Sequence, residues 1–188
     1  MGNRARLDRG AAGGGAGRGL TGASGPAKPA PMSNRVETKL AELGLTLPEP
    51  AAPVATYVPA VEAGGLLHIS GQICFAADGS LMTGRLGEDR DLDYGVEAAR
   101  RCAVMLVAQM KRALGGLERV ERIVKLGVFV NSAPGFTDQP KVANGASDLM
   151  VALFGDAGRH ARSAVGVASL PLGVAVEIDA IVQVQSAL

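Results

Sequence analysis

The chain has 188 residues, of which 47% are hydrophobic and 20% charged, and its formal net charge is +1. This composition suits one globular domain with a sizeable core. No uninterrupted apolar run approaches the roughly 18 residues of a membrane span, and no secretory signal is visible, so a soluble protein of the cytoplasm is expected.

The first 32 residues differ in composition from the rest. They hold nine of the 26 glycines and few large apolar side chains, so this stretch cannot bury enough surface to offset the entropy lost on ordering it. We predict a disordered extension over 1–32 and a single domain over 33–188. The Arg-rich start also allows a transit peptide, or an upstream start codon with Met32 as the functional one.

The extension carries much of the positive charge. It contains five basic residues and one acidic residue, and removing these from the totals of 19 and 18 leaves 14 basic and 17 acidic residues in the domain. A nucleic-acid-binding domain normally shows a basic patch or stripe. None is visible after Met32, so nucleic acid is not an expected partner.

The domain shows strand and helix patterns in alternation. Hydrophobic periodicity and turn residues predict a helix over 33–44, strands over 54–58 and 66–75, a long helix over 94–116, a strand over 122–133, a helix over 139–155 and two strands within 159–185. The first helix has Asn34 as its candidate N-cap and Gly44 as its stop. This order favours an α+β domain with helices packed on one face of the sheet.

The cysteines and histidines give little support to a metal site. Cys74 and Cys102 have neither metal-ligand spacing nor a disulfide framework, and Cys102 falls in a helical pattern where a small apolar residue is the default. His68 and His160 are the only histidines. A metal site or a Cys–His nucleophile pair is therefore not expected.

Two charges interrupt the otherwise small and apolar closing strands. If these strands form a hairpin, one face holds Arg162, Ala164, Gly166, Ala168, Ala175, Glu177 and Asp179. With the turn at 170–173, Arg162 and Glu177 stand on the order of 13 Å apart between backbones on this face. Such a gap has the size of a small metabolite.

The two charges allow two interpretations. An isolated charge is costly to bury, so each must lie in water, have a partner or serve a ligand. Arg162 forms a structural ion pair with Glu177 or Asp179 on a solvated face, or it binds a carboxylate ligand while Glu177 holds or activates a water. The spacing alone favours the ion pair, whereas the row of alanine and glycine stands against it because it leaves room for a ligand.

Several motifs occur together in one order. They are YVPAV with Tyr57, ISGQ with Gly71, KLGVFVNSAPGF with Asn131, VANGASDLMVALFG, and ARSAVGVASLPLGVAVEIDAI with Arg162 and Glu177. In this order they resemble the RidA/YjgF family, also called the endoribonuclease L-PSP family, over residues 43–184. The long loop before the main helix and the GRHARSAVGV block resemble its longer, chorismate-mutase-like branch.

The resemblance implies a chorismate-mutase-like fold assembled into homotrimers, with a ligand cleft between subunits. In the family's deaminases, the residue matching Arg162 binds the substrate carboxylate and the residue matching Glu177 positions the attacking water. Tyr57, Asn131 and Gly71 match positions in or near the cleft. Strand packing for Tyr57 and a strand-end turn for Asn131 are the structural alternatives.

One position departs from the family pattern. Many active members have cysteine where this chain has Ala164, so Ala164 puts the rate and the substrate preference in doubt. His160 compensates for this loss if it reaches the cleft, and is otherwise an ordinary loop histidine.

The resemblance favours hydrolytic deamination of reactive 2-imino and 2-enamino acids to 2-oxo acids and ammonia. No metal or organic cofactor is implied, because positioning and one charge-assisted water suffice for an imine that already hydrolyses in water. The alternative is a trimeric module that binds a carboxylate-bearing metabolite without turnover. A ribonuclease, as in the family's older name, fits poorly with an acidic domain and no paired histidines.

Overall fold

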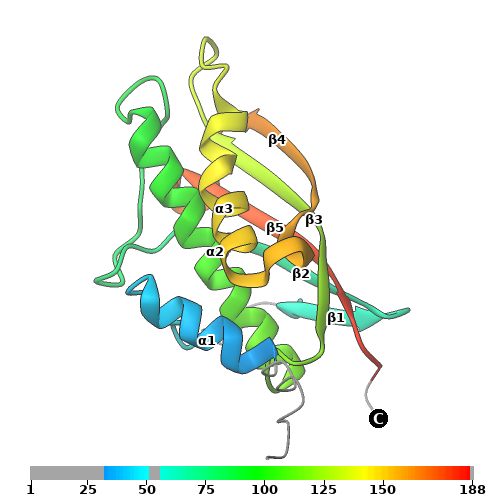
Figure 1. Ribbon diagram of the computed structural model, residues 1–188. Helices are drawn as coiled ribbons and strands as arrows, with labels where there is room; N and C mark the ends of the chain where they lie inside the picture. Colours follow the sequence, from blue (N-terminus) through cyan, green and yellow to red (C-terminus); the bar gives the residue numbers. More distant parts are fainter. Residues whose placement is uncertain (1–31, 51–55, 187–188) are drawn as a thin grey trace, which may run out of the picture.

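The computed structural model describes residues 32–50 and 56–186. They form a five-stranded sheet with a layer of helices over one face (Figure 1). The elements are α1 (Met32–Glu42), β1 (Ala60–Ala63), β2 (Leu66–Ile73), α2 (Leu92–Leu114), β3 (Val120–Asn131), α3 (Gln139–Phe154), β4 (Ala161–Val167) and β5 (Val176–Val184), with short 3₁₀ turns at Gly155–Gly158 and Pro171–Gly173.

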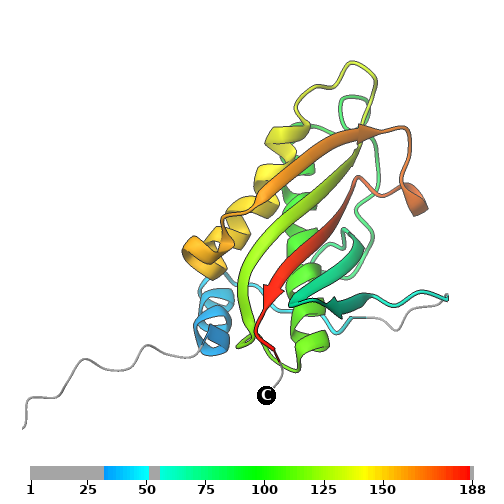
Figure 2. The same ribbon diagram turned by 90° about the vertical axis from the view of Figure 1, so that its right-hand side faces the viewer.

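The sheet is mixed, in the order β1-β2-β5-β3-β4. Only β3 and β4 run parallel among these neighbours, and a parallel pair needs a crossover connection, which α3 supplies. After a turn of 90° the sheet lies in front and the helices behind it, so one sheet face carries no helix (Figure 2). This arrangement confirms the predicted α+β class with helices on one face of a mixed sheet.

Capping residues and a close contact between helices define the helix layer. Asp91 caps α2 by accepting a hydrogen bond from the Tyr94 backbone nitrogen at 2.9 Å, and Gly115 ends it with φ 73°. The bounds of α2 and α3 agree with the prediction to within about two residues, which is the usual fraying of helix ends. Gly145 of α3 lies against the Val96 carbonyl of α2, where a Cβ would collide, so the two helices pack closely.

Among the described residues, no helix combines the length and the apolar character that a membrane span requires.

The predicted closing hairpin is wrong. Strands β4 and β5 do not pair with each other, because β3 lies between them and pairs with both. The connection between them instead joins the loop after β2: Ala175 donates a backbone hydrogen bond to Met82 at 2.9 Å, and Val174 bridges to Thr83. Strand β5 can therefore leave β4 and enter the centre of the sheet, where both of its edges are paired.

Two smaller expectations also need correction. The first strand begins after Pro59, and residues 56–58 are not in a strand; the remaining residues of the predicted 54–58 strand lie outside the described part. Asn34 lies inside α1 and does not cap it, whereas Gly44, with φ 65°, does follow the helix end as expected. The predicted extension, apart from Met32 at the start of α1, lies outside the described residues.

Candidate functional site

Arg162 is held on the helix-covered side of the edge strand β4. Its Nη1 donates hydrogen bonds to Asn144 Oδ1 and to Ser147 Oγ, both at 3.0 Å, and its Nη2 donates to the Pro140 carbonyl at 3.1 Å. All three acceptors belong to α3, which the β3–β4 crossover lays beside β4. The guanidinium is therefore fixed in place by a single helix.

The guanidinium of Arg162 keeps binding capacity after these contacts. An arginine has five N–H groups, and these three bonds leave one on Nε and one on Nη2. Within the described residues no carboxylate lies within ion-pair distance of Arg162. Arg162 therefore forms no structural ion pair with Glu177 or Asp179. Its half-buried guanidinium can bind an added anion, such as a ligand carboxylate.

His160 extends the polar cluster around Arg162. Its Nε2 lies 3.0 Å from Ser147 Oγ and its Nδ1 lies 2.6 Å from the Gly158 carbonyl. Burial lowers the pKa of His160, and the charge of Arg162 adds to this, although the Gly158 carbonyl opposes it. In the neutral ring Nδ1–H donates to Gly158, so the Ser147 hydroxyl donates to Nε2 and can accept from Arg162. His160 therefore supports the arginine through Ser147 and is not an isolated loop residue.

Glu177 lies on the opposite, helix-free face of the sheet. It is the second residue of β5, the central strand of the sheet, and lies level with Phe129 of β3 and Ile73 of β2. Its carboxylate extends over Gly71, where a Cβ would collide with Oε1. Among the described residues no hydrogen bond or ion pair engages this carboxylate. Burial raises the pKa of Glu177 and the charge of Asp179 raises it further.

The two charges do not share a face, which corrects the gap predicted from a hairpin. Arg162 pairs with Leu126 of β3, whereas Glu177 pairs with Phe129, three residues along the same strand. Because side chains alternate along a strand, positions an odd number of residues apart face opposite sides. One chain alone cannot bring Arg162 and Glu177 to the same small molecule.

The other predicted site residues divide between the two faces. Tyr57 is 57% exposed and lies outside β1, so it does not pack in the sheet. It precedes Pro59, whose carbonyl accepts hydrogen bonds from the backbone and side chain of Ser70, next to Gly71. The Tyr57 segment therefore runs beside the part of β2 under Glu177. Ala164 lies on the Arg162 side and packs partly against the core.

Asn131 has a structural role at the end of β3. It is 8% exposed, and its Nδ2 donates to the Gly84 carbonyl at 3.1 Å and to the Val174 carbonyl at 3.4 Å. These bonds tie two loops to the sheet, as the strand-end alternative requires. The amide that does contact Arg162 belongs to Asn144.

Asn144 and Ser147 are the site residues that the sequence interpretation missed. Both lie inside a predicted amphipathic helix, where polar residues are usually assigned to solvent. With Pro140 they follow an i, i+4, i+7 spacing, which places them on one helix face. That polar stripe is visible in the sequence, but its partner on β4 is not.

Comparisons with known proteins agree with this architecture. Residues 37–181 match the family described as "YjgF/chorismate_mutase-like, putative endoribonuclease". Protein TCP17 of Trypanosoma cruzi is 54% identical over 155 residues, covering 82% of this chain and 97% of that protein. The solved structure of Atu1372 from Agrobacterium tumefaciens, described as having unknown function, is 46% identical with a TM-score of 0.76, covering 82% of this chain and 96% of that one.

A third similar structure contains a ligand. TdcF of E. coli, solved with bound serine, is 27% identical with a TM-score of 0.52, and the match covers 73% of this chain and 94% of that chain. The fold, the family match and the relatives all extend over most of the described residues. The chain belongs to the YjgF/chorismate mutase-like family.

Proposed function

We propose that the protein hydrolyses reactive 2-imino or 2-enamino acids to 2-oxo acids and ammonia. The observation that carries this proposal is the state of Arg162: a guanidinium fixed by three bonds to α3, with two N–H groups left and no carboxylate partner in the described part. Such a fork suits a substrate carboxylate. The serine bound to TdcF is also a small amino acid with a carboxylate.

Glu177 is suited to the second role. Its carboxylate has a raised pKa and no partner among the described residues. The carboxylate lies over Gly71, where the missing Cβ leaves room for it. A carboxylate in this state can hold a water and take its proton as the oxygen attacks the imine carbon. That proton returns to the nitrogen to give the carbinolamine. A second proton then passes from the carbinolamine hydroxyl to the nitrogen, which leaves as ammonia as the carbonyl of the 2-oxo acid forms.

The shared site needs a second copy of the chain, because Arg162 and Glu177 face opposite sides of one sheet. The helix-free face offers apolar residues to such a copy, including Val165 at 46% and Val61 at 50% exposure. We propose a homotrimer in which the Arg162 edge of one chain meets the Glu177 face of the next. Such a cleft repeats three times under three-fold symmetry.

The decisive experiment supplies the purified full chain with an imino acid generated in situ by an amino-acid oxidase. Ammonia and 2-oxo acid should form faster than by spontaneous hydrolysis. The alternative, a trimer that binds carboxylate metabolites without turnover, gains support from Ala164 in place of the family's cysteine. Binding of a carboxylate with no rate increase over buffer would establish that alternative.

The compartment is part of the proposal. We place the protein in the cytoplasm, and the Arg-rich start makes a mitochondrial address the competing outcome. Microscopy of the full chain with a C-terminal fluorescent tag distinguishes the two.

A further inference from the structure

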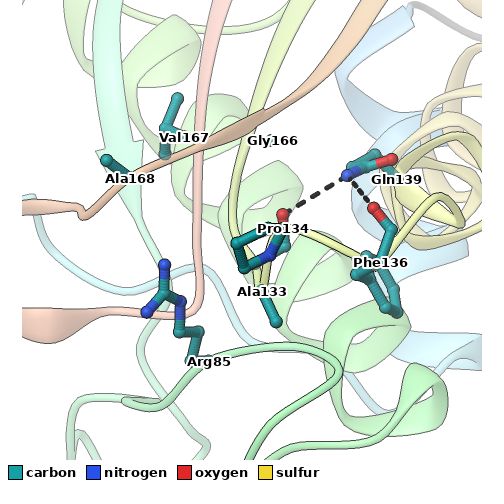
Figure 3. A pocket seen from close by; sticks show the side chains of 9 residues that line it. Arg85, Ala133, Pro134, Phe136, Gln139, Gly166, Val167 and Ala168 are labelled. Atoms are coloured by element: carbon teal, nitrogen blue, oxygen red, sulfur yellow. Dashed lines mark hydrogen bonds between the residues drawn. The ribbon is translucent and has the colours of Figure 1, made fainter.

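A hollow of about 370 Å³ lies at the end of β3, and its lining includes neither Arg162 nor Glu177. Four segments surround it: the loop after β3, the start of α3, the end of β4 and the loop before α2 (Figure 3). Its lining residues are Arg85, Ser132, Ala133, Pro134, Phe136, Gln139, Gly166, Val167 and Ala168. Arg85 is the cation of this lining, and most of the other residues are apolar.

The guanidinium of Arg85 has unused hydrogen-bonding capacity. Its Nε is buried without a hydrogen-bond partner, the one such side-chain atom among the described residues. Its Nη1 makes a long contact of 3.4 Å with the exposed Glu88. In another hollow of the described part, Arg101 donates instead to the Phe75 carbonyl at 2.7 Å and the Ala76 carbonyl at 3.3 Å. A buried N–H that lacks an acceptor is unfavourable, so Arg85 is poised for an incoming one.

The backbone around Arg85 is held in place. Leu86 donates to the Asn131 carbonyl and accepts from the Ala133 nitrogen, each at 2.9 Å. On the other side, the Gly84 carbonyl accepts from the Asn131 side chain. Arg85 therefore stands between two residues that are both bonded to the end of β3. Its head extends toward Val167 and Ala168 across the hollow (Figure 3).

Ser132 supplies a second donor to the hollow. It is 6% exposed, and its Oγ accepts from Gln139 Nε2 at 3.3 Å. The Ser132 hydroxyl hydrogen has no acceptor among the described residues. Gly166 leaves the space beside Ser132 open, because a Cβ there would lie 2.6 Å from Ser132 Oγ and 2.8 Å from Gln139 Nε2.

We propose that this hollow binds a small monocarboxylate with a compact apolar body. The carboxylate would accept from the Arg85 guanidinium and from Ser132, while the body would cover Pro134 and Phe136. A carboxylate suits the site better than a phosphate, because Glu88 contacts the same guanidinium and would repel a second negative charge. The site is independent of Arg162, and it does not require the proposed deaminase activity.

The test uses the full chain labelled with ¹⁵N and titrated with benzoate, followed by the amide signals of Ser132, Ala133 and Gly166. The wild type and Arg162→Lys should bind with equal affinity. Arg85→Gln, which removes the charge, and Gly166→Ala, which fills the space, should each weaken binding at least tenfold. Arg100→Gln is the matched control, because Arg100 forms a similar i, i+3 pair with Glu97, 3.8 Å apart, and should bind like the wild type.

The chemistry of the probe separates the remaining outcomes. Neutral benzamide should not bind, and inorganic phosphate should bind more weakly than benzoate. Equal binding of phosphate, unmoved signals at these amides, or binding that is lost in Arg162→Lys and kept in Arg85→Gln would overturn the proposal. If Arg85→Gln fails to fold, Gly166→Ala decides by itself, since unchanged affinity there would also refute the site.

Discussion

Arg162 and Glu177 stand on opposite faces of the same sheet, three residues apart in level along β3. No rotamer of either side chain brings them together through the sheet. Any reaction that uses both must therefore take one group from each of two chains. The proposed chemistry therefore requires an oligomer on geometric grounds.

Mixed oligomers should reveal the shared site. Arg162→Lys and Glu177→Gln should each be nearly inactive alone, but mixing the two chains at equal amounts should restore about a quarter of the wild-type rate, because about one cleft in four then has both native residues. The control mixes Arg162→Lys with the double variant, which can form no native cleft. Confirmed mixed oligomers without any recovery would contradict a cleft shared between chains.

Replacing Arg162 by lysine should weaken carboxylate binding by about 10- to 100-fold, the worth of one or two charge-assisted hydrogen bonds. A lysine keeps the charge but has one nitrogen, so it cannot serve Asn144, Ser147 and a ligand with the geometry of a fork. Calorimetric titration with a non-hydrolysable 2-oxo acid measures the change. Arg159→Lys, an exposed arginine paired with Asp156, is the control and should bind normally.

Glu177→Gln should separate binding from turnover and also stabilise the fold. Turnover should fall by about 10²- to 10⁴-fold, the usual contribution of a general base, while carboxylate affinity is retained. The raised pKa means that the folded state holds this proton more tightly than the unfolded chain, so stability is lost as pH rises through the folded pKa.

The amide has no charge to bury, so the Tm of Glu177→Gln should exceed that of the wild type at pH 7, and the difference should shrink toward pH 4. Glu121→Gln, at an exposed position of β3, is the matched control and should change neither Tm nor turnover. A lower Tm for Glu177→Gln at pH 7 would show that the carboxylate has a stabilising partner.

Gly71→Ala should displace the Glu177 carboxylate. The added Cβ meets Oε1 directly, and Glu177 can move only by leaving its place over β2. Turnover should fall about as far as in Glu177→Gln, while the circular dichroism spectrum remains native. Gly135→Ala, whose Cβ would meet nothing within 4 Å, provides the control. Full activity in Gly71→Ala would place the catalytic water elsewhere.

His160 should make the protein less stable in acid. Its pKa in the folded state lies below the usual value of 6.5, so the unfolded chain binds the proton more readily. Above pH 6.5 the ring is neutral in both states, and stability should fall as pH drops below this value. His160→Gln should reduce the decrease in Tm between pH 7 and pH 5. Identical acid profiles for His160→Gln and the wild type would refute this linkage.

The sequence by itself determined the elements whose signals are local. The period of apolar residues identifies α2 and α3, and Gly115 and Gly155 end them where the pattern predicts. Two sequence observations also pointed to Arg162 and Glu177. They are charged residues within strands of small residues, and they lie in motifs that follow the order of the family. Hydrophobic periodicity and caps depend on residues within a few positions, so they can be read from the chain alone.

Only the tertiary structure decided how the closing strands pair. A short connection favours a hairpin, but β3 has two free edges, and β4 and β5 take one each. Which edge a strand occupies depends on contacts with residues far away in sequence, here Met82 and Thr83. Pairing in turn decides the face of each side chain, since a change of partner or register can turn it to the other side of the sheet.

The residues that hold Arg162 could not be predicted from the sequence for the same reason. Asn144 and Ser147 form a polar stripe on α3, but their value depends on the crossover that lays this helix along β4. Local patterns therefore identified the groups that carry charge. The long-range packing decided what holds each charge, and on which face of the sheet it lies.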